Sequence, residues 1–250
     1  MPTAGDHVAL VTGASRGLGR AIAETLAAQG FRVALNYAAS HEAAKTVKEK
    51  ILAAGGVAET FAADVTDETE VAELQVAIES SLGAVDVLVI NATGPQPAVP
   101  VERLEWADML QQLEFFVKSP LLLTRTFLPG MKRRTWGRVI QIGSEVFQIG
   151  NADMSAYVAA KGAQLGLTRS WARELGPHGI TVNLIAPGWI PVERHQGTSE
   201  EAYAGYLRDV PLDHMGTPED IAAAVAYLAS DGGRFVTGQQ LSVNGGRTFA

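Results

Sequence analysis

The stretch Thr12-Gly13-Ala14-Ser15-Arg16-Gly17-Leu18-Gly19 decides the fold. It follows the apolar run 8–12 and leads into the helical pattern 20–29, which Gly30 ends. The N–H groups and the dipole at the start of a helix attract an anion, and glycines let the backbone come close to it. A strand, a glycine-rich turn and a helix in this order therefore predict a phosphate-binding βα unit. The alternative is an ordinary glycine-rich turn.

The rest of the chain repeats this alternation of short apolar runs and longer amphipathic stretches. Strands are expected at 31–37, 57–63, 85–90, 138–142, 181–185 and 240–243, and helices at 41–54, 69–81, 155–175 and 218–230. The stretch 102–134 is expected to be mostly helical, with Pro120 and Pro129 as boundaries or kinks. Such alternation predicts βαβ units and a parallel sheet with both faces covered. We therefore expect an α/β fold, a Rossmann-like doubly wound parallel sheet in a three-layer α/β/α arrangement. Residues 1–250 should form one dinucleotide-binding domain, with a substrate loop at about 188–212.

Composition excludes several classes of protein. The net charge of −7, from 20 basic and 27 acidic residues, disfavours binding to nucleic acid, which needs a basic face. The chain has no cysteine, and its five histidines do not pair at a metal-ligand spacing, so no metal site is expected. No apolar run approaches the ~20 residues that span a bilayer, and residues 1–7 do not resemble a secretion signal. A cytoplasmic protein without a membrane partner is expected.

Tyr157 and Lys161 are the first candidates for chemistry. They lie four residues apart in the expected helix 155–175 and therefore share one face. A phenol titrates at about 10, and a neighbouring ammonium group favours the phenolate, so the pair can move a proton near neutral pH. Ser144 follows the strand 138–142 at its carboxyl end, where α/β sheets place ligands, and its hydroxyl can hold a substrate oxygen.

The glycine spacing G-x-x-x-G-x-G resembles that of the short-chain dehydrogenase/reductase family, and Ser144, Tyr157 and Lys161 resemble its catalytic set. Other segments agree with the family over roughly residues 8–246, and they are Asp64-Val65, Asn91-Ala92-Thr93-Gly94 (Thr93 being a departure), Arg173-Glu174, Asn183, Pro187-Gly188 and Thr237-Gly238. The resemblance implies an enzyme in which Tyr157 is the acid or base, Lys161 lowers its pKa, and Ser144 holds the substrate oxygen.

The resemblance also implies a bound nicotinamide dinucleotide. Its expected contacts are Gly13, Ser15, Arg16, Gly17, Leu18, Gly19, Asn36, Ser40, Asp64, Val65, Asn91, Ala92, Tyr157, Lys161, Pro187, Gly188 and Ile190. No acidic residue stands between Leu35 and Ser40 to hold a ribose 2′-hydroxyl, and Arg16 lies inside the glycine turn. Both features favour NADP(H) over NAD(H), with Asn36 and Ser40 as neutral partners of the 2′-phosphate. Alternatively, Arg16 is a solvated loop residue and Asn91 a structural brace.

Phe116 departs from the family pattern. The family commonly has an asparagine there, and the alignment is anchored by Pro120 and by 127–131. In the family, that asparagine takes part in a water relay behind the lysine, partly through a backbone carbonyl that Phe also supplies. We expect a working but modified proton relay. The alternative is that Phe116 only fills core or interface volume.

Glu145 is a candidate for substrate contact because it comes directly after Ser144, where a carboxylate is unusual for the family. Further candidates lie in the variable region after Pro187-Gly188, and they are Trp189, Ile190, His195, Tyr203 and Tyr206. The alternatives are that Glu145 is solvated at the rim of the site and that Trp189 covers the core.

Taken together, the residues predict an NADP(H)-dependent oxidoreductase that moves hydride between nicotinamide and a carbonyl or secondary alcohol. Within the family, the chain most resembles the 3-oxoacyl-thioester reductases. One alternative is an enzyme for a secondary metabolite, a sugar or a cyclic alcohol, and another is a non-catalytic NADP(H)-binding regulatory module. The resemblance also implies a homo-oligomer, a dimer or a tetramer, formed through helices 102–134 and 155–175. On these, Phe115, Leu122 and Trp171 fit an interface as well as a core.

Overall fold

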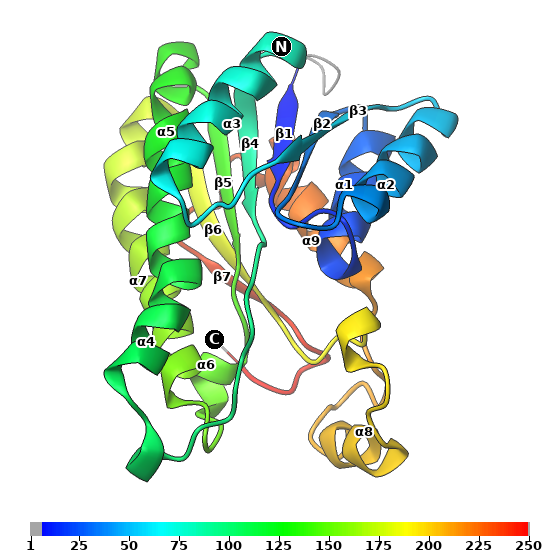
Figure 1. The fold of residues 1–250 in the computed structure, drawn as a ribbon, viewed down its shortest axis with the longest axis vertical. Helices are drawn as coiled ribbons and strands as arrows, with labels where there is room; N and C mark the ends of the chain where they lie inside the picture. The colour runs from blue at the N-terminus through cyan, green and yellow to red at the C-terminus, as the bar shows by residue number, and fades with distance from the viewer. Residues whose placement is uncertain (1–6, 250) are drawn as a thin grey trace.

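Seven parallel strands form one sheet in the order β3-β2-β1-β4-β5-β6-β7 (Figure 1). This computed structural model describes residues 7–249, so the expectation about the first residues lies outside the described part except for His7. The strands are β1 (Val8–Val11), β2 (Arg32–Tyr37), β3 (Val57–Ala62), β4 (Val85–Ile90), β5 (Gly137–Ile142), β6 (Ile180–Pro187) and β7 (Gln240–Val243). The helices are α1 (Gly17–Ala28), α2 (His41–Ala53), α3 (Glu68–Ser81), α4 (Trp106–Leu113), α5 (Ser119–Arg134), α6 (Val146–Ile149), α7 (Ser155–Leu175), α8 (Glu200–Leu207) and α9 (Pro218–Ala229).

Helices cover both faces of the sheet, which confirms the predicted three-layer, doubly wound fold (Figure 1). Residues of β1 alternate between the two faces because successive side chains of a strand point in opposite directions. Val8 and Leu10 pack in the cluster that includes residues of α3, α5 and α7. Ala9 and Val11 pack in the cluster that includes residues of α1, α2 and α9. Since all four are buried, β1 lies at the centre of both apolar layers.

The strand order reverses beside β1, because β2 lies on one side of it and β4 on the other. In open α/β sheets, ligands bind at the carboxyl ends of the strands beside such a reversal. All the strands are parallel, so the segments that follow them meet at one edge. The fold therefore gathers the glycine turn, Ser144 and the 187–190 turn at a single edge of the sheet.

The stretch 102–134 was expected to be mostly helical, with Pro120 and Pro129 as boundaries or kinks, and it is divided just before Pro120. Helices α4 and α5 are joined by a π-helical turn, Glu114–Lys118, which carries Phe116. Pro120 lies in the first turn of α5 and Pro129 inside that helix. Helices α6 and α8 were not predicted, although the Ser199 hydroxyl accepts a hydrogen bond from the Ala202 N–H (3.2 Å), a usual signal for the start of a helix. Within residues 7–249, no helix combines the length and apolar character that a membrane crossing requires.

Thr12 joins the end of β1 to the end of β4. Its hydroxyl oxygen accepts hydrogen bonds from the backbone N–H groups of Asn91 (2.9 Å) and Ala92 (3.0 Å). The side chain is fully buried, so these donors have no water to replace the hydroxyl. One side chain therefore fixes the start of the glycine turn against the segment after β4.

Replacing Thr12 with Val keeps the shape of the side chain but leaves two backbone donors without an acceptor. Because each unsatisfied buried donor costs ~1–3 kcal/mol, Thr12→Val should lower the free energy of unfolding by about 2 kcal/mol or more. The matched control is Thr46→Val, since Thr46 is exposed and its hydroxyl bonds only to the carbonyl of Glu42 within α2. Urea denaturation measures both variants, and equal losses would contradict the role of Thr12.

Candidate active site

The glycine turn has the geometry of an anion cradle. Gly13 and Gly17 have φ values of +64° and +54°, a region that side chains disfavour. A Cβ on Gly19 would overlap the carbonyl oxygen of Gly13, so the chain passes itself too closely for any side chain. Helix α1 starts at Gly17 without an acidic residue in its first turn. Its free N–H groups therefore fit the diphosphate of a dinucleotide.

Two asparagines hold this turn in place. The Asn36 amide donates to the carbonyl oxygens of Ala63 (3.0 Å) and Phe61 (3.4 Å), and its Oδ1 accepts from the Gly13 N–H (3.4 Å). The predicted contact of Asn36 with a phosphate is therefore corrected, because its buried polar atoms are engaged within the protein. The Asn91 amide donates to the carbonyl oxygen of Thr12 (2.9 Å), which supports its reading as a brace.

Arg16 is exposed in the glycine turn, and among residues 7–249 no carboxylate forms an ion pair with it. The other residues predicted to bind the cofactor all follow the carboxyl ends of strands. They are Ser15 and Leu18 after β1, Ser40 after β2, Asp64 and Val65 after β3, Ala92 after β4, and Pro187, Gly188 and Ile190 at and after the end of β6. Ile190 is 5% exposed and packs in the core, which leaves its side chain little surface for a ligand.

The amine of Lys161 is buried and points inward. Its Nζ donates to the carbonyl oxygen of Ile142 (2.9 Å) and to Oε1 of Gln164 (3.0 Å). It also lies 3.8 Å from the centre of the Phe116 ring. Burial, helped by the positive charge of Arg194, lowers the pKa of Lys161 well below its ordinary 10.5.

Tyr157 lies beside this amine, with the centre of its ring 5.6 Å from Nζ of Lys161. Burial raises the pKa of the Tyr157 phenol above its ordinary 10.0, against the lowering effects of a hydrogen bond with Ser144 and of the charge of Arg194. Lys161 was predicted to lower the pKa of Tyr157. This prediction is wrong, because burial raises that pKa. The Lys161 amine instead contacts the carbonyl oxygen of Ile142, the side chain of Gln164 and the ring of Phe116.

Gln164 and Arg194 were not predicted to belong to the site. Gln164 is 1% exposed, and behind it the Gln141 amide donates to Thr168 Oγ1 (2.9 Å), whose hydroxyl donates to the Gln164 carbonyl (2.9 Å). One feature of the sequence could have indicated this network, because Gln141 is a polar residue within the mostly apolar run 137–142. Arg194 had no such signal, because its proximity to Tyr157 depends on the path of the 188–198 loop.

Glu145 is not at the solvated rim, so that alternative is wrong. It is 3% exposed, and its carboxylate binds the Tyr206 hydroxyl (3.0 Å), the Asn244 amide (3.0 Å) and the Arg247 guanidinium (2.8 Å). Its oxygens are therefore engaged within the protein rather than free for a substrate.

Aromatic side chains gather around Trp189. Its ring stacks on Tyr203 (4.9 Å between centres) and meets Tyr206 (5.5 Å) and His195 (6.0 Å) edge to face. Nδ1 of His195 also accepts a hydrogen bond from the Val192 N–H (3.2 Å). Trp189 and His195 thus belong to one cluster after β6, the segment predicted to face the substrate.

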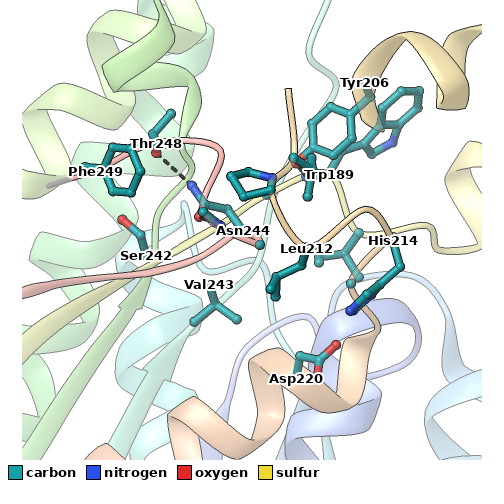
Figure 2. A pocket seen from close by; sticks show the side chains of 17 residues that line it. Trp189, Tyr206, Leu212, His214, Asp220, Ser242, Val243, Asn244, Thr248 and Phe249 are labelled. Carbon is teal, nitrogen blue, oxygen red and sulfur yellow. Dashed lines mark hydrogen bonds between the residues drawn. The ribbon is translucent and has the colours of Figure 1, made fainter. Parts of the chain in front are cut away.

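A cavity of about 740 Å³ lies between this segment and the C-terminal residues (Figure 2). Its lining includes Trp189, Tyr206, Leu212, Asn244 and Phe249. Ser144, Tyr157 and Lys161 do not line it, so the cavity is separate from the catalytic set. Within residues 7–249, no three histidine, aspartate or glutamate side chains form a cluster able to hold a metal ion.

Comparison with known proteins agrees with this geometry. A family model described as enoyl-(acyl carrier protein) reductase matches residues 13–248. The chain is 41% identical over 240 residues to the 3-oxoacyl-[acyl-carrier-protein] reductase of Staphylococcus aureus, covering 95% of this chain and 96% of that protein. An NADPH-dependent reductase involved in bacilysin biosynthesis has a TM-score of 0.91 at 30% identity, covering 98% of this chain and 99% of its own. A blue fluorescent protein from a metagenomic library, in complex with NADPH, has a TM-score of 0.89 at 35% identity, covering 97% and 98%.

The chain belongs to the short-chain dehydrogenase/reductase family, which confirms the resemblance seen in the sequence. It is an oxidoreductase of that family, an enzyme that acts on carbonyl or alcohol groups.

Replacing Phe116 with Leu removes the ring face from the Lys161 amine while keeping an apolar side chain. A ring stabilises the charged amine by ~1 kcal/mol, so its loss lowers the pKa of Lys161 further. The amine then loses its proton at lower pH, and the alkaline limb of the pH–rate profile for reduction should move down by roughly 0.7 pH unit.

The matched control is Phe115→Leu, since the Phe115 ring lies 6.5 Å from that of Phe116 and Lys161 is not placed over it. In Phe115→Leu, the alkaline limb of the pH–rate profile should stay at its wild-type position. If the limb stays in place in both Phe116→Leu and Phe116→Asn, position 116 has no part in proton transfer.

Proposed function

We propose that this enzyme uses NADP(H) to reduce the 3-oxo group of an acyl thioester to a secondary alcohol. The observation that carries the proposal is that Tyr157 lies beside Lys161 and shares a hydrogen bond with Ser144, at the edge of the sheet where the glycine turn also lies. The 41% identity to a 3-oxoacyl-[acyl-carrier-protein] reductase over 95% of the chain supports the substrate class. A non-catalytic module would leave the retention of all three residues without a reason.

The bound cofactor would supply the hydride. The residues of the chain bind the substrate oxygen and protonate it. Ser144 holds the carbonyl oxygen, and Tyr157, whose raised pKa keeps the phenol protonated at neutral pH, gives that oxygen a proton. Lys161 supplies a positive charge 5.6 Å from the centre of the Tyr157 ring when it is protonated, and that charge favours the phenolate left behind.

The choice of NADP(H) rests on charge at the end of β2. The segment after Tyr37 has no carboxylate before Glu42. Arg16 is exposed, and among residues 7–249 no carboxylate pairs with it. An unpaired guanidinium suits a 2′-phosphate, which it can bind through two hydrogen bonds. Two similar structures are named as NADPH-dependent or in complex with NADPH, which supports the same choice.

A reductase of a secondary metabolite is the second candidate. It is favoured by the TM-score of 0.91 to the reductase involved in bacilysin biosynthesis. In either case, residues of about 188–212 would form the substrate loop of a single domain in a cytoplasmic enzyme.

The proposed homo-oligomer would use the face that carries α4 and α5. Leu122 is in the core, which removes it from the interface candidates, whereas Trp106, Leu110 and Leu121 are 67%, 45% and 47% exposed.

The first test measures NADPH oxidation by absorbance against a short-chain 3-oxoacyl thioester, a keto sugar and a cyclic ketone. The thioester should give the highest kcat/KM. Tyr157→Phe should lower kcat by about 10²–10⁴-fold because the proton donor is lost. Tight NADPH binding without turnover of any carbonyl compound by the wild type would contradict the proposal and favour a regulatory module.

The second test concerns the 2′-phosphate. Arg16→Ala should weaken NADPH binding by about tenfold to a hundredfold, the value of a charge-assisted hydrogen bond, and leave NADH binding nearly unchanged. Arg20→Ala is the matched control, because Arg20 is an exposed arginine in α1 that is paired with Glu193 (3.0 Å). Fluorescence titration reports both affinities, and an equal loss for NADPH and NADH would rule out recognition of the phosphate by Arg16.

A further inference from the structure

Glu145 joins segments that are far apart in the sequence. Its Oε1 accepts hydrogen bonds from the Tyr206 hydroxyl (3.0 Å) and from Nη1 of Arg247 (2.8 Å), and its Oε2 accepts from the Asn244 amide (3.0 Å). Tyr206 belongs to α8, whereas Asn244 and Arg247 follow β7. The residue after the catalytic serine therefore holds both the helix of the substrate loop and the C-terminal segment.

The same residue fixes the turn after β6. The Glu145 N–H donates to the carbonyl oxygen of Pro187 (3.1 Å). The Tyr206 hydroxyl, while donating to Glu145, accepts from the N–H of Trp189 (2.7 Å). Two connections, one through the backbone and one through Tyr206, thus run from the serine segment to the 187–189 turn.

Arg247 balances the charge of the buried carboxylate. Besides the ion pair with Glu145, its guanidinium lies 4.3 Å from the centre of the Tyr206 ring and 3.6 Å from Oδ2 of Asp209. Burial and the neighbouring Glu145 raise the pKa of Tyr206 to about 12, so this hydroxyl stays a donor at neutral pH. The groups that face Glu145 are therefore one cation and two neutral donors.

We propose that Glu145 is a positioning residue that sets α8 and the Trp189 turn at a fixed place relative to Ser144. The carbonyl oxygen of a substrate is held by Ser144, and the rest of the substrate must fit the wall that α8 and Trp189 form. The network therefore acts mainly on affinity for the carbonyl substrate, because most of the expected dinucleotide contacts lie on segments that it does not bind. This inference rests on the proposed function, since it assigns 188–212 to the substrate.

Tyr206 and Tyr203 provide a matched pair for the test. Both belong to α8, and both rings pack on Trp189, at 5.5 Å and 4.9 Å between centres. Only the Tyr206 hydroxyl is part of the network, because among the described residues none forms a hydrogen bond with the Tyr203 hydroxyl. Substitution by Phe keeps each ring and removes one hydroxyl.

The experiment compares Tyr206→Phe, Tyr203→Phe and Glu145→Gln in steady-state kinetics with NADPH and the best ketone. Tyr206→Phe should raise KM for the ketone about tenfold, the effect of losing a hydrogen bond to a charged group, with KM for NADPH within about twofold. Tyr203→Phe keeps the ring on Trp189 and lies outside the network, so it should raise this KM clearly less than Tyr206→Phe does. Glu145→Gln leaves the Arg247 guanidinium without its counter-charge and places an amide donor among the donors of the network, so it should raise KM for the ketone at least as much as Tyr206→Phe. The double variant should show less than the sum of the two effects, because both changes break the same network.

Hydrogen–deuterium exchange of the α8 amides gives a readout that does not need a substrate. These amides should exchange faster in Tyr206→Phe than in Tyr203→Phe or the wild type. Equal exchange and equal ketone KM in the two tyrosine variants would overturn the role of Glu145. If the wild type reduces no ketone, the proposed function fails, and faster exchange in Tyr206→Phe alone would still show that the network holds α8.

Discussion

The amine of Lys161 is removed from water, and the elements around it replace the hydrogen bonds that water would make. An ammonium group has three donors, and burying it without partners is costly. Here the end of β5 offers the Ile142 carbonyl, α7 offers Gln164, and the π-helical turn offers the face of Phe116. The position of the amine therefore requires three separate elements to meet, and Tyr157, one turn earlier on α7, is placed by the same contacts.

The departure at position 116 is explained by this arrangement. Phe116 packs in a small apolar cluster with Tyr157 and Ala160, so it fills core volume. It also faces the amine of Lys161, so it acts on the charge that the mechanism uses. The hypothesis that Phe116 fills core volume is therefore supported, whereas the modified proton relay stays a prediction. π-Helical turns are rare and often occur at functional sites, and the turn Glu114–Lys118 is what brings Phe116 to this place.

Much of this could be predicted from the sequence, because the signals are local. The apolar run 85–90 and the helix 155–175 were predicted with the bounds that the structure has, since continuous burial and helical periodicity are properties of adjacent residues. The contacts of Asn36, Glu145 and Gln164 could not be predicted, because their partners are distant in the sequence or depend on the side-chain direction. The pKa of Tyr157 was misjudged for a related reason, as burial depends on the whole fold and here outweighs the nearby charges.

The most direct test of this account is the titration of the Lys161 amine by NMR. The chain has six lysines, so labelling them at the ε position gives few signals, and Lys161→Met identifies the one in question. The buried site predicts that the Lys161 signal titrates well below its ordinary 10.5. If the Lys161 signal titrates at the ordinary 10.5, the amine is in water, and the arrangement of Ile142, Gln164 and Phe116 around it is contradicted.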